Sequence, residues 1–185
     1  VQAAEISTFG IGGDSRIYLG RNGETEIGPQ KVIPLCIAGS EHPELIHEIK
    51  SFRRVGDLKT YSAQEADCYM YLGKKPSKEV TGKDDKIIEK LKERPHSITY
   101  LAKIIGKDPE TVDLTPLVEE GVLARIGVTP TDVLHVQGRY NAWNRQVAYA
   151  GIEILAKRRE MSVSSFLFDV ERKIKARLAM TCVQA

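Results

Sequence analysis

The sequence predicts an α+β (α/β) fold in which N-terminal β-hairpins with flanking helices precede a mainly helical remainder. Two glycine-containing turns, at residues 12–15 and 20–23, each interrupt strand-like residues. From residue 84 onward, apolar residues instead recur at helical spacing. We therefore expect three parts: a β-rich part over residues 1–80, a winged-helix-like helical segment over 81–127, and C-terminal helices over 128–185 that complete the first part.

The composition limits the kinds of function that need considering. With 185 residues, 42% of them hydrophobic, the chain can bury one core, or a main domain with a smaller insert. The formal charge of +2 comes from 27 basic and 25 acidic residues that are interspersed, which gives no strong field for nucleic acid or acidic lipid. We find no membrane-spanning run or signal peptide, so no membrane partner is expected. The three cysteines, Cys36, Cys68 and Cys182, lack CxxC spacing, which predicts reduced thiols, a cytoplasmic location and no metal site.

The first glycine turn, Gly12-Gly13-Asp14-Ser15, lies between strand-like residues 8–11 and 16–19. Its glycines can have either of two roles. They can supply the backbone freedom that a tight hairpin turn needs, or they can present bare N–H groups to a phosphate or carboxylate, with the Ser15 hydroxyl beside them. The residue pattern leaves both interpretations open.

Further elements follow in order along the first part. Asn22-Gly23 predicts a tight hairpin between residues 16–19 and 25–28, and residues 31–37 are expected to be extended at a sheet edge because they contain Pro34. Apolar residues at helical spacing predict a helix over 42–54. His42 and His47 are five residues apart, so they do not share a helical face as a metal pair would. The aromatic and branched residues of 66–73 predict a strand of a kind that can lie at the centre of a sheet.

The helical segment has the element order of a winged helix. Ile87, Ile88 and Leu91 define one helix, Ser97 is expected to cap a second that ends at Gly106, a third is expected over 111–120, and a strand over 122–126. The third helix would be the recognition helix, but it carries Asp113, Glu119 and Glu120, which would repel phosphates. We therefore expect a protein-facing or purely structural insert and no nucleic acid.

The last part begins with a helix signal at Thr129-Pro130-Thr131-Asp132, where Thr129 caps the helix and Asp132 favours its dipole. Val133, Leu134, Val136 and His135 are then expected to face inward. His135 can be a core residue with satisfied hydrogen bonds, or Asp132 and His135 can line a substrate cleft as acid and base. Two longer helices should follow, one over 147–155 in which Gly151 permits close packing, and one over 162–180 that buries residues including Phe166 and Val170.

Three sequence stretches resemble the hydantoinase/oxoprolinase family. They are Gly10-Ile-Gly-Gly-Asp-Ser-Arg-Ile17, Ile27-Gly28-Pro29, and Gly127-Val-Thr-Pro-Thr-Asp-Val-Leu-His135. This family belongs to the actin, sugar-kinase and Hsp70-like ATPases, and its members use ATP to open a cyclic amide such as hydantoin or 5-oxoproline. The family's Asp-x-Gly-Gly-Thr phosphate hairpins have no match in this chain, so Gly12-Gly13-Asp14-Ser15 resembles the family's later glycine turn. The resemblance thus implies a piece of a longer enzyme.

The resemblance also implies roles for residues and for partners. Gly12, Gly13, Asp14 and Ser15 would bind nucleotide, and Asp132 and His135 would be catalytic. ATP and Mg²⁺ are implied for the full-length parent, with no metal ligand in this chain, and the partners would be the cyclic amide and the missing N-terminal part. A second subunit or an oligomer stays open. The chain alone is expected to be inactive, and the alternative is a non-catalytic interaction or nucleic-acid-binding module that uses the winged-helix-like segment.

Overall fold

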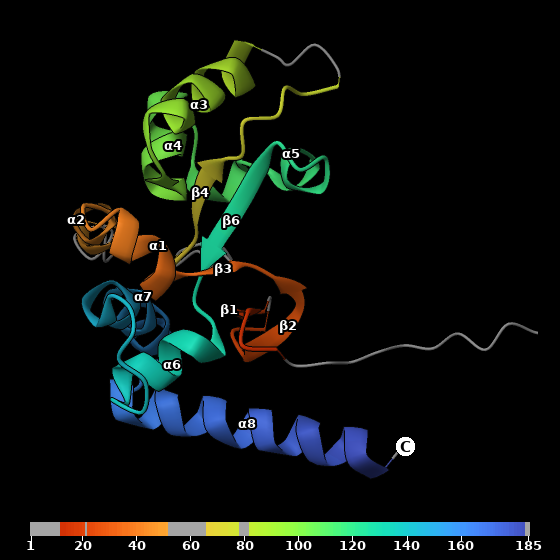
Figure 1. The fold of residues 1–185 in the computed structure, drawn as a ribbon, viewed down its shortest axis with the longest axis vertical. Helices are drawn as coiled ribbons and strands as arrows, with labels where there is room; N and C mark the ends of the chain where they lie inside the picture. Colours follow the sequence, from red (N-terminus) through yellow and green to blue (C-terminus); the bar gives the residue numbers. More distant parts are fainter. Residues whose placement is uncertain (1–11, 21, 52–65, 78–81, 184–185) are drawn as a thin grey trace, which may run out of the picture.

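The computed structural model describes residues 12–20, 22–51, 66–77 and 82–183, and it has the expected α+β architecture (Figure 1). The long axis of the molecule runs from α3 at one end to α8 at the other. The strands are β1 (Ser15–Leu19), β2 (Thr25–Lys31), β3 (Ile33–Pro34), β4 (Cys68–Tyr71), β5 (His96–Ser97) and β6 (Leu123–Gly127). The helices are α1 (Leu35–Glu41), α2 (Leu45–Ser51), α3 (Gly82–Glu93), α4 (Ile98–Ile104), the 3₁₀ helix η2 (Pro109–Thr111), α5 (Thr115–Glu119), α6 (Pro130–Val136), α7 (Arg145–Arg158) and α8 (Val163–Val183).

The hairpin that Asn22-Gly23 predicts is confirmed, because β1 and β2 pair antiparallel with Leu19 opposite Thr25. Gly23 has φ of +74°, and the Asn22 side chain accepts from the N–H of Glu24, so each turn residue has the role its type favours. The strand predicted over residues 8–11 lies outside the described residues.

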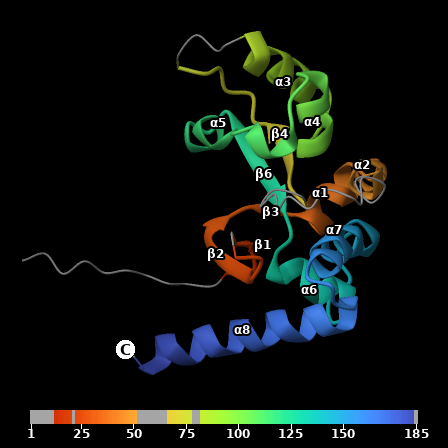
Figure 2. The ribbon, with the colours of Figure 1, turned by 180° about the vertical axis from the view of Figure 1, so that it is seen from behind.

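Helix α8 runs beside the hairpin at the outer edge of β2 (Figure 2). The ammonium of Lys173 donates to the carbonyl of Thr25 over 2.8 Å, and the guanidinium of Arg177 donates to the carbonyl of Ile27. These basic side chains occupy strand carbonyls that would otherwise be open to another strand.

The second sheet has the strand order β3-β6-β4-β5. Strand β4 is central, as its aromatic sequence allows, with antiparallel neighbours on both sides. Pro34 lies in the edge strand β3, where a missing N–H is tolerated. The extended segment predicted over 31–37 ends earlier than expected, because Leu35, Cys36 and Ile37 already belong to helix α1.

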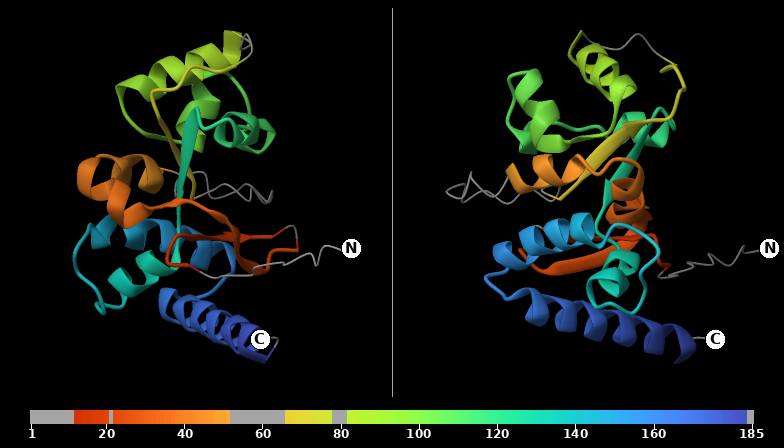
Figure 3. Two further views of the ribbon diagram at one scale, coloured as in Figure 1. Left: turned by 45° about the vertical axis from the view of Figure 1, so that its right-hand side comes forward. Right: turned by 60° about the vertical axis from the view of Figure 1, so that its left-hand side comes forward.

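The two faces of this sheet cover two separate hydrophobic clusters. Residues on β4 and β6 alternate between the faces, as the side chains of a strand must. One face contributes Cys68 and Ile126 to a cluster with α1, α2, α6, α7, α8 and the hairpin. The other contributes Tyr69 and Leu123 to a cluster with α3, α4 and α5. Figure 3 shows α3, α4 and α5 as one group around the upper part of β4 and β6, with α6, α7 and α8 toward the other end of the molecule.

The helical segment differs from the prediction at its third helix. Ser97 does cap α4, accepting from the N–H of Tyr100. The stretch 111–120, however, is divided between η2 and a short α5. Val112 and Leu114 between them are both buried, and the Asp113 carboxylate accepts from the N–H of Thr115. Local side-chain bonds therefore compete with one continuous helix.

The C-terminal helices form largely as predicted. Leu134 is an exception, with 40% of its surface exposed, because α6 turns only Val133 and Val136 toward the main cluster. His135 is buried under the loop that follows the helix. Within the described ranges, no helix combines the length and apolarity that crossing a bilayer requires.

Candidate functional site

The glycine turn is closed by its own residues. The Ser15 N–H donates to the carbonyl of Gly12 over 3.1 Å, and the Gly12 N–H donates to the Ser15 hydroxyl over 3.0 Å. Gly13 at the tip is exposed, whereas Ser15 is buried. Among the described residues, no hydrogen bond is assigned to the N–H groups of Gly13 and Asp14. The tip of the turn thus retains two adjacent backbone donors.

Thr131 holds this turn against the first turn of α6. Its hydroxyl and its N–H both donate to the carbonyl of Gly13, over 2.7 and 3.2 Å. A Cβ on Gly13 would lie 2.8 Å from this same hydroxyl oxygen, so a glycine fits where a larger residue would push the turn away. The structure therefore brings the turn of Gly12–Ser15 next to the helix that carries Asp132 and His135.

Asp132 is completely buried and accepts hydrogen bonds from two helix starts. One carboxylate oxygen accepts from the N–H and the hydroxyl of Thr129, completing a capping box for α6. The carboxylate also accepts from the N–H groups of Leu35 and Cys36, over 3.2 and 2.7 Å, at the start of α1. Burial raises the pKa of Asp132, and the donors from Cys36 and Thr129 partly offset this rise. The four donors give the carboxylate a structural task.

His135 also has both ring nitrogens engaged. Its Nδ1 lies 2.8 Å from the carbonyl of Thr131 and must donate to it, so Nε2 accepts from the Trp143 N–H over 3.2 Å. This arrangement corresponds to the neutral imidazole. The Trp143 ring stacks on the histidine at 5.3 Å and the Tyr140 ring meets it edge-on at 5.1 Å. A general base would need the lone pair that Trp143 occupies, so this geometry favours the core interpretation of His135.

A buried charge cluster near the turn escapes sequence reasoning. Arg16 on β1 and Arg125 on β6 are 4% and 8% exposed, and both guanidinium groups approach the Asp67 carboxylate, at 2.5 and 3.7 Å. Both also donate to the amide oxygen of Gln30. Burial raises the pKa of Asp67, against the two guanidinium groups that favour its ionised form. The available signal is one arginine in each of two short, otherwise mostly apolar strands, but that signal does not identify the distant aspartate.

The two described thiols do not add a nucleophile to the site. Cys36 and Cys68 are buried and free, and burial is the main cause that raises the pKa of each thiol. The side chain of Cys182 lies outside the described part. Among the described residues, no group of three or more His, Cys, Asp or Glu side chains could hold a metal ion.

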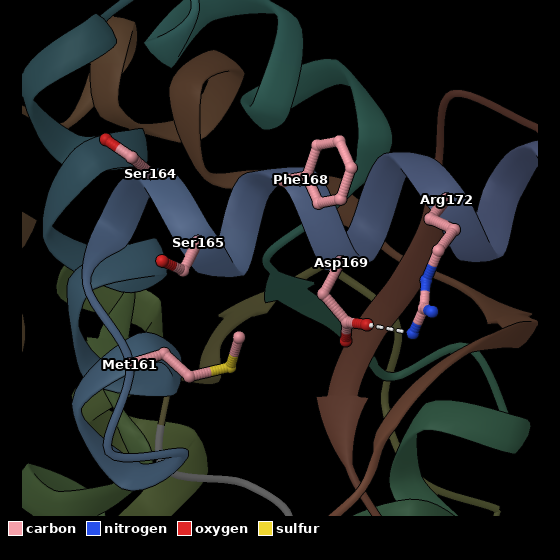
Figure 4. Close-up of a pocket in the computed structure, with 6 residues that line it drawn as sticks. All are labelled: Met161, Ser164, Ser165, Phe168, Asp169 and Arg172. Carbon is pink, nitrogen blue, oxygen red and sulfur yellow. Dashed lines mark hydrogen bonds and ion pairs between the residues drawn. The ribbon is translucent and has the colours of Figure 1, made fainter.

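Two surface hollows lie apart from the predicted site residues. One, of about 480 Å³, is on α8, where Phe168 is 71% exposed and Asp169 pairs with Arg172 (Figure 4). The other, of about 500 Å³, lies between α2 and the start of α7, and His47 is among the residues that line it. None of the six predicted site residues lines either hollow.

Neither a known protein family, nor a curated protein, nor a solved structure matches the chain.

Proposed function

We propose that the chain is part of a hydantoinase/oxoprolinase-like, ATP-dependent hydrolase that opens cyclic amides in the cytoplasm. In the parent enzyme, ATP would phosphorylate the amide oxygen of the ring, and water would then attack the activated carbon. The Gly12–Ser15 turn would contribute main-chain donors to the phosphates of the nucleotide.

One observation supports this role more than any other: among the described residues, no acceptor is assigned to the two adjacent N–H groups of Gly13, which is exposed, and Asp14. Neighbouring backbone N–H groups on a glycine turn are a common way to hold a phosphate. The turn is also fixed in place by Thr131, so the donors would cost little ordering energy on binding.

The charges around the turn agree with a secondary contact to the nucleotide. Asp14 forms an ion pair with Lys31 at 3.3 Å, so its negative charge is partly compensated. The described residues offer backbone donors for a phosphate but no ready set of Mg²⁺ ligands. Bound Mg²⁺ would neutralise charge on the phosphates, and we assign its ligands to the missing part of the parent.

Asp132 and His135 would serve this function by holding the turn in position. Asp132 fixes the start of α6, and Thr131 on that same first turn binds Gly13. Direct proton transfer by either residue would require breaking the contacts that now occupy their polar atoms. We therefore propose positioning roles for both in place of the acid and base roles that the resemblance implies.

The proposal is tested by titrating the isotope-labelled chain with ATP and, separately, with inorganic phosphate, while amide resonances are followed by NMR. We expect saturable shifts of the Gly13 and Asp14 amides. A Gly13→Val variant that remains folded by circular dichroism should lose these shifts, because its side chain would displace the turn from Thr131. Unchanged Gly13 and Asp14 resonances at millimolar ATP and phosphate would remove the support for a nucleotide role.

A second candidate is a protein-interaction module built on the winged-helix-like segment. The order α3, β5, α4, α5, β6 around a small sheet favours it. The exposed residues at η2 and α5 include Asp108, Glu110, Asp113 and Glu119, which would repel a phosphate backbone. A salt-sensitive gel shift with random duplex DNA would contradict the protein-facing form of this candidate.

A further inference from the structure

Glu48 on α2 makes a contact, outside the β3-β6-β4-β5 sheet, between the part of the molecule that holds the main hydrophobic cluster and the part that holds α3, β5 and α4. Its neighbours on α2, Leu45 and Ile49, belong to the main hydrophobic cluster. Its carboxylate reaches the segment 94–97, which leads from the end of α3 through β5 to the start of α4. We propose that Glu48 is a latch that fixes α3, β5 and α4 on the main body, and that its release opens this part without unfolding the rest.

Three donors meet the Glu48 carboxylate at similar distances. The ring Nδ1 of His96 lies 2.8 Å from Oε1, and the guanidinium of Arg94 lies 2.8 Å from the same oxygen. The N–H of Ser97 donates to Oε2 over 2.8 Å. All three donors come from four consecutive residues, so one side chain determines where this segment lies.

The contact also closes the edge of the sheet. Strand β5 is the edge strand of the order β3-β6-β4-β5, and Ser97 pairs with Cys68 on its inner side. On the outer side, the Ser97 N–H donates to the Glu48 carboxylate and is therefore not open to pairing with another strand. Ser97 itself caps α4. Loss of Glu48 would therefore disturb the end of the sheet and the beginning of α4 together.

His96 depends on Glu48 for its placement. The ring is 2% exposed, and its Nε2 has no hydrogen-bond partner within the described part of the chain. Glu48 supplies the hydrogen bond to Nδ1, and Tyr100 stacks on the ring with a centroid distance of 4.2 Å. Without the carboxylate, a buried imidazole would lose the one hydrogen bond assigned to its side chain, which is a costly state that favours local opening.

The test is hydrogen exchange by mass spectrometry on the whole chain and its Glu48→Gln variant at neutral pH. Gln keeps the size of the side chain but removes the charge, and its amide group can accept from fewer of the three donors. We expect exchange in residues 82–104 to accelerate by at least about tenfold, while exchange in α7 changes by less than about twofold. Glu44→Gln is the matched control, because Glu44 lies just before α2 and its carboxylate pairs with His42, 3.5 Å away in the same segment.

Each outcome decides the proposal. Acceleration confined to 82–104 supports a latch, whereas equal acceleration in 82–104 and α7 shows a general loss of stability and overturns it. Unchanged exchange in 82–104 also overturns it. If Glu48→Gln does not fold, Arg94→Gln removes one of the three donors and should give a smaller acceleration in the same segment, and the same criteria apply.

Discussion

At the scale of single residues, Asp132 shows how one carboxylate can stabilise two helices that are distant in sequence. The Thr129–Asp132 pattern predicts the cap of α6, and the structure confirms it. The sequence does not reveal that the same carboxylate also accepts from Leu35 and Cys36. Pro34, before α1, offers no side-chain cap, so Asp132 provides the acceptor that this helix lacks.

Replacing Asp132 with Ala should therefore destabilise the chain more than loss of an ordinary cap. The variant leaves buried N–H groups at the starts of α1 and α6 without acceptors, and we expect a loss of about 2 to 4 kcal/mol in the free energy of unfolding. Urea denaturation followed by circular dichroism measures this. As a control, Asp113→Ala removes an exposed contact to Thr115 and should cost less than about 1 kcal/mol. Equal losses in the two variants would contradict the double-capping role.

The contacts of Glu48 lead to a prediction about how their stabilising effect changes at low pH. Burial raises its pKa, but the hydrogen bonds from His96, Ser97 and Arg94 outweigh this and lower the pKa below the ordinary 4.5. Because the folded pKa is depressed, the stabilisation is complete above about pH 4.5 and is lost as the pH falls through the folded value. The groups that face this carboxylate are Arg94, His96 and the Cys68 thiol, with Glu93 near the imidazole.

The protection that Glu48 gives to residues 82–104, compared with Glu48→Gln, should accordingly be complete at neutral pH and shrink below pH 4.5. The ratio of the hydrogen-exchange rates of this segment in the two chains, taken at a series of pH values, measures it. A ratio that stays constant down to pH 3 would show that the ionised form of Glu48 adds nothing to the latch.

At the scale of elements, local patterns predict what forms, and tertiary contacts decide where elements end. The hairpin and the Ser97 and Thr129 caps follow from turn and capping chemistry, and the structure confirms them. Leu35–Ile37 is helical because a carboxylate almost a hundred residues later caps it, which no local window contains. Of the candidate site, sequence reasoning finds the turn and α6, but it misses Thr131 as their link because a single threonine carries no distinctive pattern.

Helix α7 depends on a close approach at Gly151, as its apolar stripe predicts. A Cβ at this position would collide with the Leu35 side chain and lie 3.0 Å from Val128. We expect Gly151→Ala to destabilise the chain by about 1 to 3 kcal/mol, although alanine favours an isolated helix by about 1 kcal/mol. Gln146→Ala, at an exposed position of the same helix, should be nearly neutral in thermal denaturation. A Gly151→Ala variant more stable than the parent would show that Leu35 moves aside freely.

At the scale of the whole molecule, one sheet separates two hydrophobic clusters, and the glycine turn belongs to only one of them. Strands β4 and β6 contribute to both clusters, while the turn rests on α6 in the main cluster. The helical segment can therefore change its position with less effect on the turn than a change in α6 would have. This division gives the proposed nucleotide contact and the proposed latch separate structural bases.

The final prediction concerns turnover by the isolated chain. Phosphoryl transfer requires cationic groups and metal-binding carboxylates around the phosphates, whereas the turn offers backbone donors beside an Asp14–Lys31 pair whose charges offset each other. We expect the chain to bind ATP weakly and to release no phosphate above background in the presence of Mg²⁺. A phosphate-release assay, with the Gly13→Val variant as control for contaminating ATPases, measures this. Mg²⁺-dependent hydrolysis that the variant abolishes would show that the chain carries a complete catalytic site, and our proposal that the Mg²⁺ ligands belong to another part of the parent would then be wrong.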